Sequence, residues 1–182
     1  MSEELLIRCC APTLASIKTG NMFTCRFETE QDMNNHLRRF NRRLREKGLR
    51  MVPLRYREGV GLIYVYRPQK LTCDLCNAQA SELLSSCGYN CEHHACCVRQ
   101  LRSKLNQQND FPHEIGLFLG YPPEDVDGFM HRKQEAKCSG HWKVYGDVES
   151  AQRRFALYRK CTAAYLNQWK SGRPLEKLTI RQ

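Results

Sequence analysis

Two residues that lie far apart in the chain, Cys10 and His113, are of the types that nucleophilic catalysis uses. Cys10 comes just before Pro12, which favours the first turn of a helix, and His113 comes just before an apolar run that predicts a strand over residues 115–120. A thiol at a helix N-terminus has a lowered pKa because the helix dipole stabilises the thiolate, and a nearby histidine can act as its base. The pair predicts a thiol-dependent hydrolase or acyl transferase.

A catalytic imidazole is oriented by an acidic side chain, and three aspartates that follow His113 are candidates for this role. We place Asp125 first, with Asp127 and Asp147 as the others. The order of a helix-starting cysteine and a later strand-starting histidine resembles that of papain-like cysteine hydrolases. The alternative is structural: Cys10 packs as a small apolar residue, and His113 bonds a loop carbonyl.

Cysteines and histidines are dense between residues 73 and 97, which suggests a metal site as a second type of function. The spacing of Cys73 and Cys76 is that of a zinc knuckle, and Cys87 and Cys91 supply two further thiolates. Four such sulfurs predict a zinc site, an iron–sulfur cluster or a redox sensor. The competing interpretation is that Cys91 belongs to the apolar face of a helix and is part of the core.

A run of basic residues offers a third type of function, the binding of a polyanion such as a nucleic acid. Some of them share one side of a predicted helix, away from its apolar stripe, where they are able to follow phosphates. Such a run more often forms only a solvated face of a helix, and no zinc-finger, RNA-binding or helix-turn-helix motif accompanies it. The run comprises Arg38, Arg39, Arg42, Arg43, Arg45, Lys47 and Arg50.

The composition limits the class of protein. At 182 residues the chain fits one domain, and its net charge of +10 favours acidic partners. No apolar run is long enough to cross a membrane, and residues 1–7 contain acids where a secretory signal has lysines. We therefore expect a cytoplasmic protein that does not bind membranes and whose eleven cysteines are mostly reduced thiols.

The order of the predicted elements indicates an α+β fold in a single domain over residues 1–182, with a small, mainly antiparallel sheet flanked by helices. Capping residues and apolar spacing define most of the helices. A Cys-rich helical hairpin is expected within residues 73–106. We predict helices over residues 2–8, 12–17, 29–48, 80–87, 90–105, 123–130 and 147–172, and strands over residues 50–56, 61–66, 115–120 and 142–145.

Four ordered motifs resemble a bacterial family that is known only as a domain of unknown function, family 3793. The resemblance spans about residues 6–169 and implies a single-domain cytosolic protein with no assigned activity or cofactor. It also implies a shared motif around Cys10 and His113, which equally fits a ligand pocket formed by His113 with Lys18, Glu114 and Tyr121. The motifs are CAPTLA at residues 10–15, YVYRP at 64–68, FPHEIGLFLGYP at 111–122 and WKVYGD at 142–147.

Overall fold

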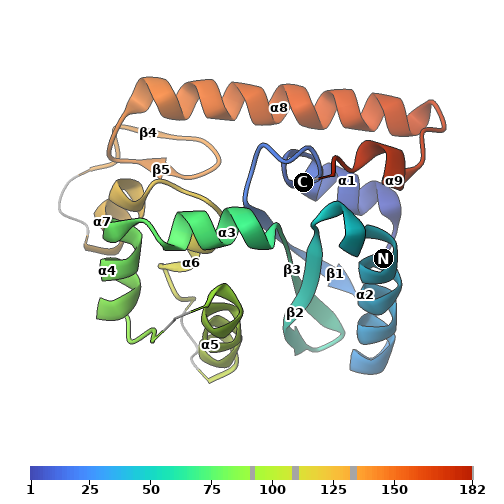
Figure 1. Cartoon of the computed structure of the whole chain (residues 1–182), viewed down its shortest axis with the longest axis horizontal. Helices are drawn as coiled ribbons and strands as arrows, with labels where there is room; N and C mark the ends of the chain where they lie inside the picture. The colour runs from blue at the N-terminus through green and yellow to red at the C-terminus, as the bar shows by residue number, and fades with distance from the viewer. Residues whose placement is uncertain (91–92, 108–110, 132–134, 182) are drawn as a thin grey trace.

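The computed structural model describes residues 1–90, 93–107, 111–131 and 135–181 (Figure 1). The fold is α+β, with a small antiparallel sheet flanked by helices, as predicted. No helix in the described ranges is long and apolar enough to cross a membrane. The helices are α1 (Glu3–Leu14), α2 (Glu30–Leu44), the short 3-10 helix η1 (Arg45–Lys47), α3 (Pro68–Leu75), α4 (Ala78–Ser86), α5 (His94–Gln107), α6 (Ile115–Phe118), α7 (Pro123–His131), α8 (Val148–Lys170) and α9 (Leu175–Leu178).

The sheet contains β1 (Gly20–Arg26), β2 (Arg50–Arg57) and β3 (Val60–Tyr66) in the order β1-β3-β2. The predicted hairpin of β2 and β3 is confirmed, while β1 was not predicted. β3 is the central strand, and six of its seven residues are buried because helices cover both of its faces. A second, two-stranded sheet pairs β4 (Cys138–Ser139) with β5 (Lys143–Val144).

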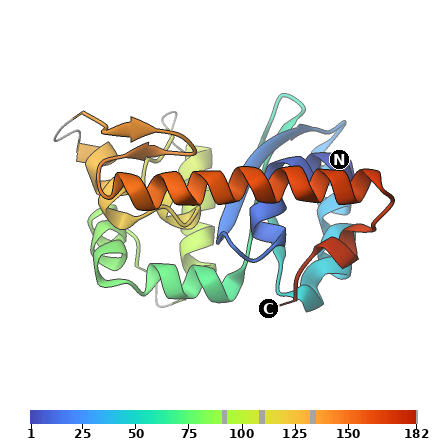
Figure 2. The same cartoon turned by 90° about the horizontal axis from the view of Figure 1, so that it is seen from above.

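Two hydrophobic clusters cover the two faces of the main sheet. On one face, α1 and α2 pack with Ile63 and Val65. On the other face, α3, α4, α5 and α6 pack with Leu62 and Tyr64. The long helix α8 runs along the length of the molecule (Figure 2), and its first half packs with β5 in a third hydrophobic cluster. The region formed by α6, α7, β4 and β5 is thereby held at one end of the molecule.

Arg67 ties several of these elements together from a fully buried position. Its guanidinium donates hydrogen bonds to the carbonyls of Thr13 and Leu14 at the end of α1, to that of Lys47 and to that of Ile180, at 2.7 to 3.0 Å. The Thr13 and Leu14 carbonyls also accept from the backbone N–H groups of Ser16 and Ile180, so the buried cation adds charge-assisted bonds at the negative end of the α1 dipole and links it to residues distant in the sequence.

Capping residues were good predictors of where helices begin. The Thr29 side chain accepts a hydrogen bond from the backbone of Asp32 at the start of α2, and the Asp147 side chain accepts one from Ser150 at the start of α8. Both helices were predicted. These interactions are local in sequence, which is why they can be recognised without the fold.

Two predictions about the elements beside Cys10 and His113 are wrong. α1 continues through Pro12 without a break, because Leu6, Ile7, Cys10 and Leu14 form one buried stripe that compensates for the backbone bond lost at the proline. Residues 115–118 form the helix α6 rather than a strand. All four are buried, and a short run that is apolar on every side does not distinguish a strand from a helix.

Candidate functional site

Cys10 lies in the interior of α1 and not at a helix start. Its side chain is fully buried in the cluster between α1 and the sheet, and burial raises the pKa of its thiol well above the usual value. The nearby Lys18 opposes this rise only in part. The helix dipole therefore does not activate Cys10 as the sequence pattern predicted, and the thiol is kept in its neutral form.

His113 lies in the turn before α6 and is exposed. Its ring meets the ring of Phe129 edge-on, with 4.9 Å between the centroids. Within the described part of the chain, neither ring nitrogen of His113 has a hydrogen-bond partner. The structure does not bring Cys10 and His113 together, since the first belongs to the core under α1 and the second lines a surface pocket. Catalysis by a pair of Cys10 and His113 stays a prediction, and the separation of the two residues argues against it.

Asp125, which was predicted to orient His113, forms its hydrogen bonds with residues around β5. Its carboxylate is buried and accepts hydrogen bonds from the indole Nε1 of Trp142 and from the backbone N–H groups of Tyr145 and Gly146, each at 2.7 Å. These bonds join the first turn of α7 to the chain on both sides of β5. Asp125 thus positions Trp142, which is the largest side chain of the pocket wall.

The pocket that contains His113 has a volume of about 440 Å³. We call it the aromatic pocket, because it is lined by five rings, which come from the segments on either side of α6, from α7 and from the β4–β5 hairpin. Tyr121 stacks on Trp142 with 4.8 Å between the centroids, and its hydroxyl donates to the carbonyl of His141. The lining residues are Phe111, His113, Ile115, Gly116, Tyr121, Asp125, Val126, Phe129, Ser139, Gly140, Trp142 and Lys143.

A glycine places Tyr121 in this wall. Gly120 has a φ of +73°, a conformation that L side chains rarely adopt, and a Cβ there would lie 2.8 Å from the Thr19 hydroxyl. The chain can turn sharply after α6 because of this residue. Tyr121 then lies between the aromatic pocket and the interior of the protein.

The two other residues predicted to form a ligand pocket have different positions. Lys18 is buried behind Tyr121, where its Nζ donates to the carbonyl of Gly20 and lies 5.3 Å from the centre of the Tyr121 ring. Burial lowers the pKa of Lys18 to about 8. Glu114 is buried and accepts hydrogen bonds from Tyr89 and Lys104. Of the predicted set, Tyr121 and His113 line the aromatic pocket, while Lys18 and Glu114 do not.

A second, polar cavity of about 380 Å³ lies on the other side of Tyr121 and Asp125, under the first turns of α8. It contains Asp74, whose carboxylate accepts a hydrogen bond from the Thr19 hydroxyl and whose pKa is raised by burial. Arg154 from α8 also lines it. Sequence reasoning did not single out Asp74 or Arg154, because the elements that carry them are distant along the chain.

The predicted metal ligands are only partly described by the structure. Cys73 and Cys76 are exposed at the end of α3, and Cys87 lies half-buried at the end of α4. Cys91 lies outside the described residues. Among the residues that are described, no group of three or more histidines, cysteines or acids is placed to hold a metal ion. The zinc or iron–sulfur site stays a prediction.

The comparisons with known proteins identify a family but no activity. No curated protein and no solved structure matches the chain. The model of one family, described as a protein of unknown function, matches residues 6–179, which is nearly the whole chain and includes every residue of the aromatic pocket. The chain therefore belongs to the DUF3793 family.

Proposed function

We propose that this protein binds a small planar aromatic acid in the aromatic pocket. The observation that carries the proposal is a group of aromatic rings beside two basic side chains, His113 and Lys143, which have no hydrogen-bond or ion-pair partner among the residues that the structure describes. Ligand pockets are typically concave and mostly apolar, with a few polar groups that orient the ligand. The volume of about 440 Å³ is in the range of such pockets.

The rings favour a flat ligand. Trp142 and Tyr121 form one stacked wall, and the ring of Phe129 is held in place by His113 at its side. Phe111, at the rim, is 44% exposed, which is high for a phenylalanine. Burying such ring surface against an aromatic ligand is favourable through the hydrophobic effect and ring stacking.

The charges favour an acidic group on that ligand. The ammonium group of Lys143 lies 5.5 Å from the centre of the Phe129 ring, and it has no ion pair or hydrogen bond within the described residues. Asp125 also lines the pocket, but its carboxylate already accepts hydrogen bonds from three N–H groups. A carboxylate or sulfonate on the ligand would therefore find donors from Lys143 and His113, whose bonds do not have to be taken from Asp125.

Two fluorescent probes with related ring systems test both parts of the proposal. 1-Anilinonaphthalene-8-sulfonate carries an acidic group, and N-phenyl-1-naphthylamine lacks it. We expect the sulfonate to bind more tightly. Lys143→Met should weaken sulfonate binding about fivefold, the effect of one partly exposed charge pair, and should leave binding of the neutral probe unchanged.

The matched control is Lys160→Met, which removes the same charge from an exposed position on α8 that does not line the pocket. It should change neither affinity. Equal affinities for the two probes, or equal effects of the two lysine variants, would contradict the proposed preference for an acid. Binding that is insensitive to both Lys143→Met and Trp142→Ala would place the probes outside the aromatic pocket.

A further inference from the structure

A second surface, away from the aromatic pocket, is formed where α2 and α5 lie on either side of the edge strand β2. The Asn41 side chain of α2 bonds the backbone N–H and carbonyl of Met51, and the Asn106 side chain of α5 bonds the carbonyl of Leu54. Arginines project from both helices and from the start of β2 along this edge. We call this surface the basic face and define it by Arg38, Arg42, Arg45, Arg50, Arg99 and Arg102.

The arginines of the basic face are not paired with acids. Within the described residues none of them has an ion pair, although Arg43, on the opposite flank of α2, binds both Glu3 and Glu176. Glu46 is the only acidic residue between positions 33 and 57, and the sequence of α5 contains none. The face therefore keeps its positive charge, which an acidic partner would neutralise.

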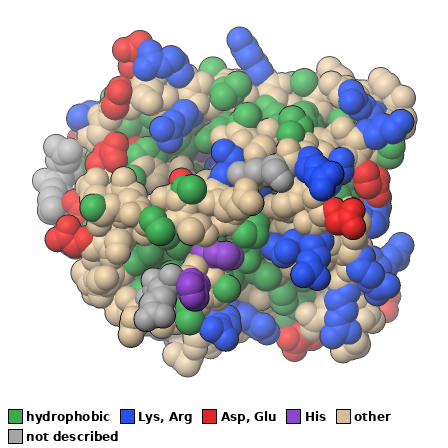
Figure 3. Space-filling model, in the orientation of Figure 1, with side chains coloured by type: hydrophobic (Ala, Val, Ile, Leu, Met, Phe, Trp, Pro, Cys, Tyr) green, Lys and Arg blue, Asp and Glu red, His purple; other side chains and the backbone are tan. Residues whose placement is uncertain are grey.

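The positions of the side chains make this charge continuous across the two helices. Arg38 and Arg45 share a flank of α2 with Asn41, and Arg99 and Arg102 share a flank of α5 with Asn106. Arg50 lies between the helices, where it donates to the Arg45 carbonyl. Figure 3 shows Lys and Arg side chains gathered at the lower right, over these elements.

The edge of β2 itself is not available to a peptide strand. Asn41 occupies both hydrogen-bonding groups of Met51, and Pro53 has no N–H to offer. In the part of the chain that the structure describes, the large exposed hydrophobic residues are Ile17, Phe111, Leu157 and Ile180, and none of them belongs to α2, β2 or α5. The described face therefore offers no large apolar side chain for insertion into a membrane and no exposed phenylalanine or tryptophan for stacking on unpaired bases.

We infer that the basic face binds the phosphate backbone of a nucleic-acid duplex. A duplex presents a dense row of negative charge and needs neither apolar nor stacking contacts. The 15 residues of α2 span about 22 Å, a length over which a duplex carries about a dozen phosphates. The six arginines thus face more phosphates than they can contact, and binding is independent of base sequence.

The salt dependence of binding to a fluorescein-labelled 20-base-pair DNA duplex, followed by anisotropy, tests this inference. If about five of the arginines contact phosphates, the logarithm of the affinity falls with the logarithm of the salt concentration with a slope of about −4 to −5. The double variant Arg45→Gln/Arg99→Gln should make the slope less steep by about 2 and weaken binding about tenfold or more at 100 mM salt.

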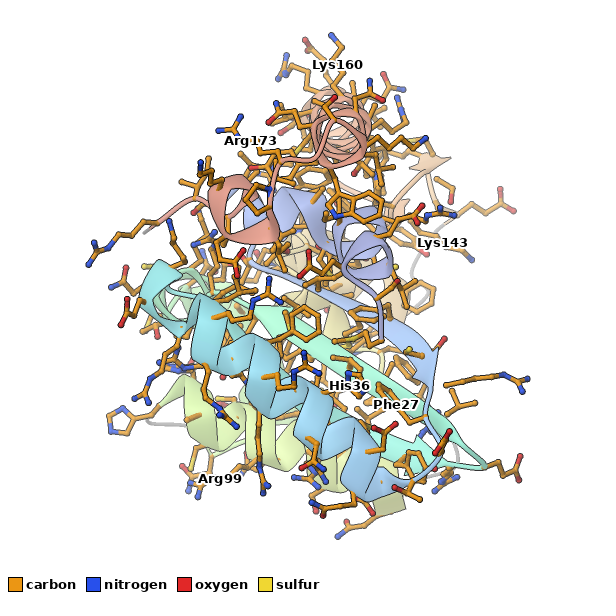
Figure 4. All side chains as sticks on the ribbon, turned by 90° about the vertical axis from the view of Figure 1, so that its right-hand side faces the viewer. Phe27, His36, Arg99, Lys143, Lys160 and Arg173 are labelled. Atoms are coloured by element: carbon orange, nitrogen blue, oxygen red, sulfur yellow. The ribbon has the colours of Figure 1, made fainter. Side chains whose placement is uncertain are left out.

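The matched control is Arg159→Gln/Lys160→Gln, which removes the same net charge from exposed positions on α8. Figure 4 shows Lys160 at one end of the molecule and Arg99 near the other. The control variant should retain most of the slope of affinity against salt concentration that the wild type shows. Equal losses in the two double variants, no duplex binding at 50 mM salt, or binding to phosphatidylserine vesicles in its place would each overturn the inference.

Discussion

Replacing Asp125 by asparagine tests whether this residue is a structural anchor of the aromatic pocket or a catalytic orienter. In the structure its Oδ1 accepts from Tyr145 and Gly146, and its Oδ2 accepts from Trp142. Asparagine keeps one acceptor oxygen and presents an NH₂ group to one of these donors, so that two donors face each other in a buried place. With about 1.5 to 3 kcal/mol for each bond to a charged group, we expect a loss of about 2 to 4 kcal/mol in the free energy of unfolding.

A double-mutant cycle with Trp142→Phe isolates the part of this loss that belongs to the indole N–H. Phenylalanine keeps an aromatic ring in the wall but removes the donor that the asparagine NH₂ would oppose. Asp125→Asn should therefore destabilise the Trp142→Phe protein less than the wild type, with a coupling of about 2 kcal/mol. Urea unfolding followed by far-ultraviolet circular dichroism measures all four proteins by one signal that does not depend on tryptophan.

Two results would refute this reasoning. If Asp125→Asn lowers the free energy of unfolding by less than about 0.5 kcal/mol, the three hydrogen bonds do not hold the pocket wall. If the two substitutions are additive within about 0.5 kcal/mol, the bond between Asp125 and Trp142 contributes nothing measurable.

Three other predictions concern buried groups. Arg67→Met should lower the free energy of unfolding by about 3 to 5 kcal/mol in urea titrations, because it removes four hydrogen bonds and takes from the Lys47 and Ile180 carbonyls the one donor that they have among the described residues, and a loss below about 1 kcal/mol would contradict the role of Arg67. The pKa of Lys18 is lowered from 10.5 to about 8 in the folded protein. Between these two pH values the unfolded chain therefore binds more protons than the folded one, and the contribution of Lys18 to the free energy of unfolding rises with pH. Between pH 7 and 10 the free energy of unfolding of the wild type, relative to that of Lys18→Met, should rise by about 2 to 3 kcal/mol, whereas a difference independent of pH would show that the lysine is not desolvated. In peptide mass spectrometry after alkylation at pH 7, Cys73 and Cys76 should react well before Cys10, and rapid reaction of Cys10 would restore the prediction of a reactive thiol.

The elements that sequence predicted correctly are those that local chemistry determines. The caps at Thr29 and Asp147 and the β2–β3 hairpin depend on residues a few positions apart. β1 and α6 depend on tertiary context instead. β1 pairs with β3, about forty positions further along the chain, and α6 is helical inside a fully apolar surrounding that is equally compatible with a strand.

The site was predictable to a similar extent. His113 and Tyr121 were recognised because a polar residue beside an apolar run and a turn of Gly120 and Pro122 are visible in the sequence. The position of Cys10 was misjudged because Pro12 favours a helix start, and only the buried stripe of α1 shows that the helix continues through it. The contact between Thr19 and Asp74 joins residues 55 positions apart, so no local pattern indicates it.

The most direct test of the aromatic pocket is a titration with 2-naphthoate followed by the indole N–H signals in a ¹H–¹⁵N correlation spectrum. The chain has two tryptophans, of which Trp142 lines the pocket and Trp169 packs near the cluster on the other side of the fold. We predict a saturable shift of the Trp142 signal while the Trp169 signal stays in place. An unchanged Trp142 signal at saturating 2-naphthoate, or a shift of Trp169 alone, would contradict the account.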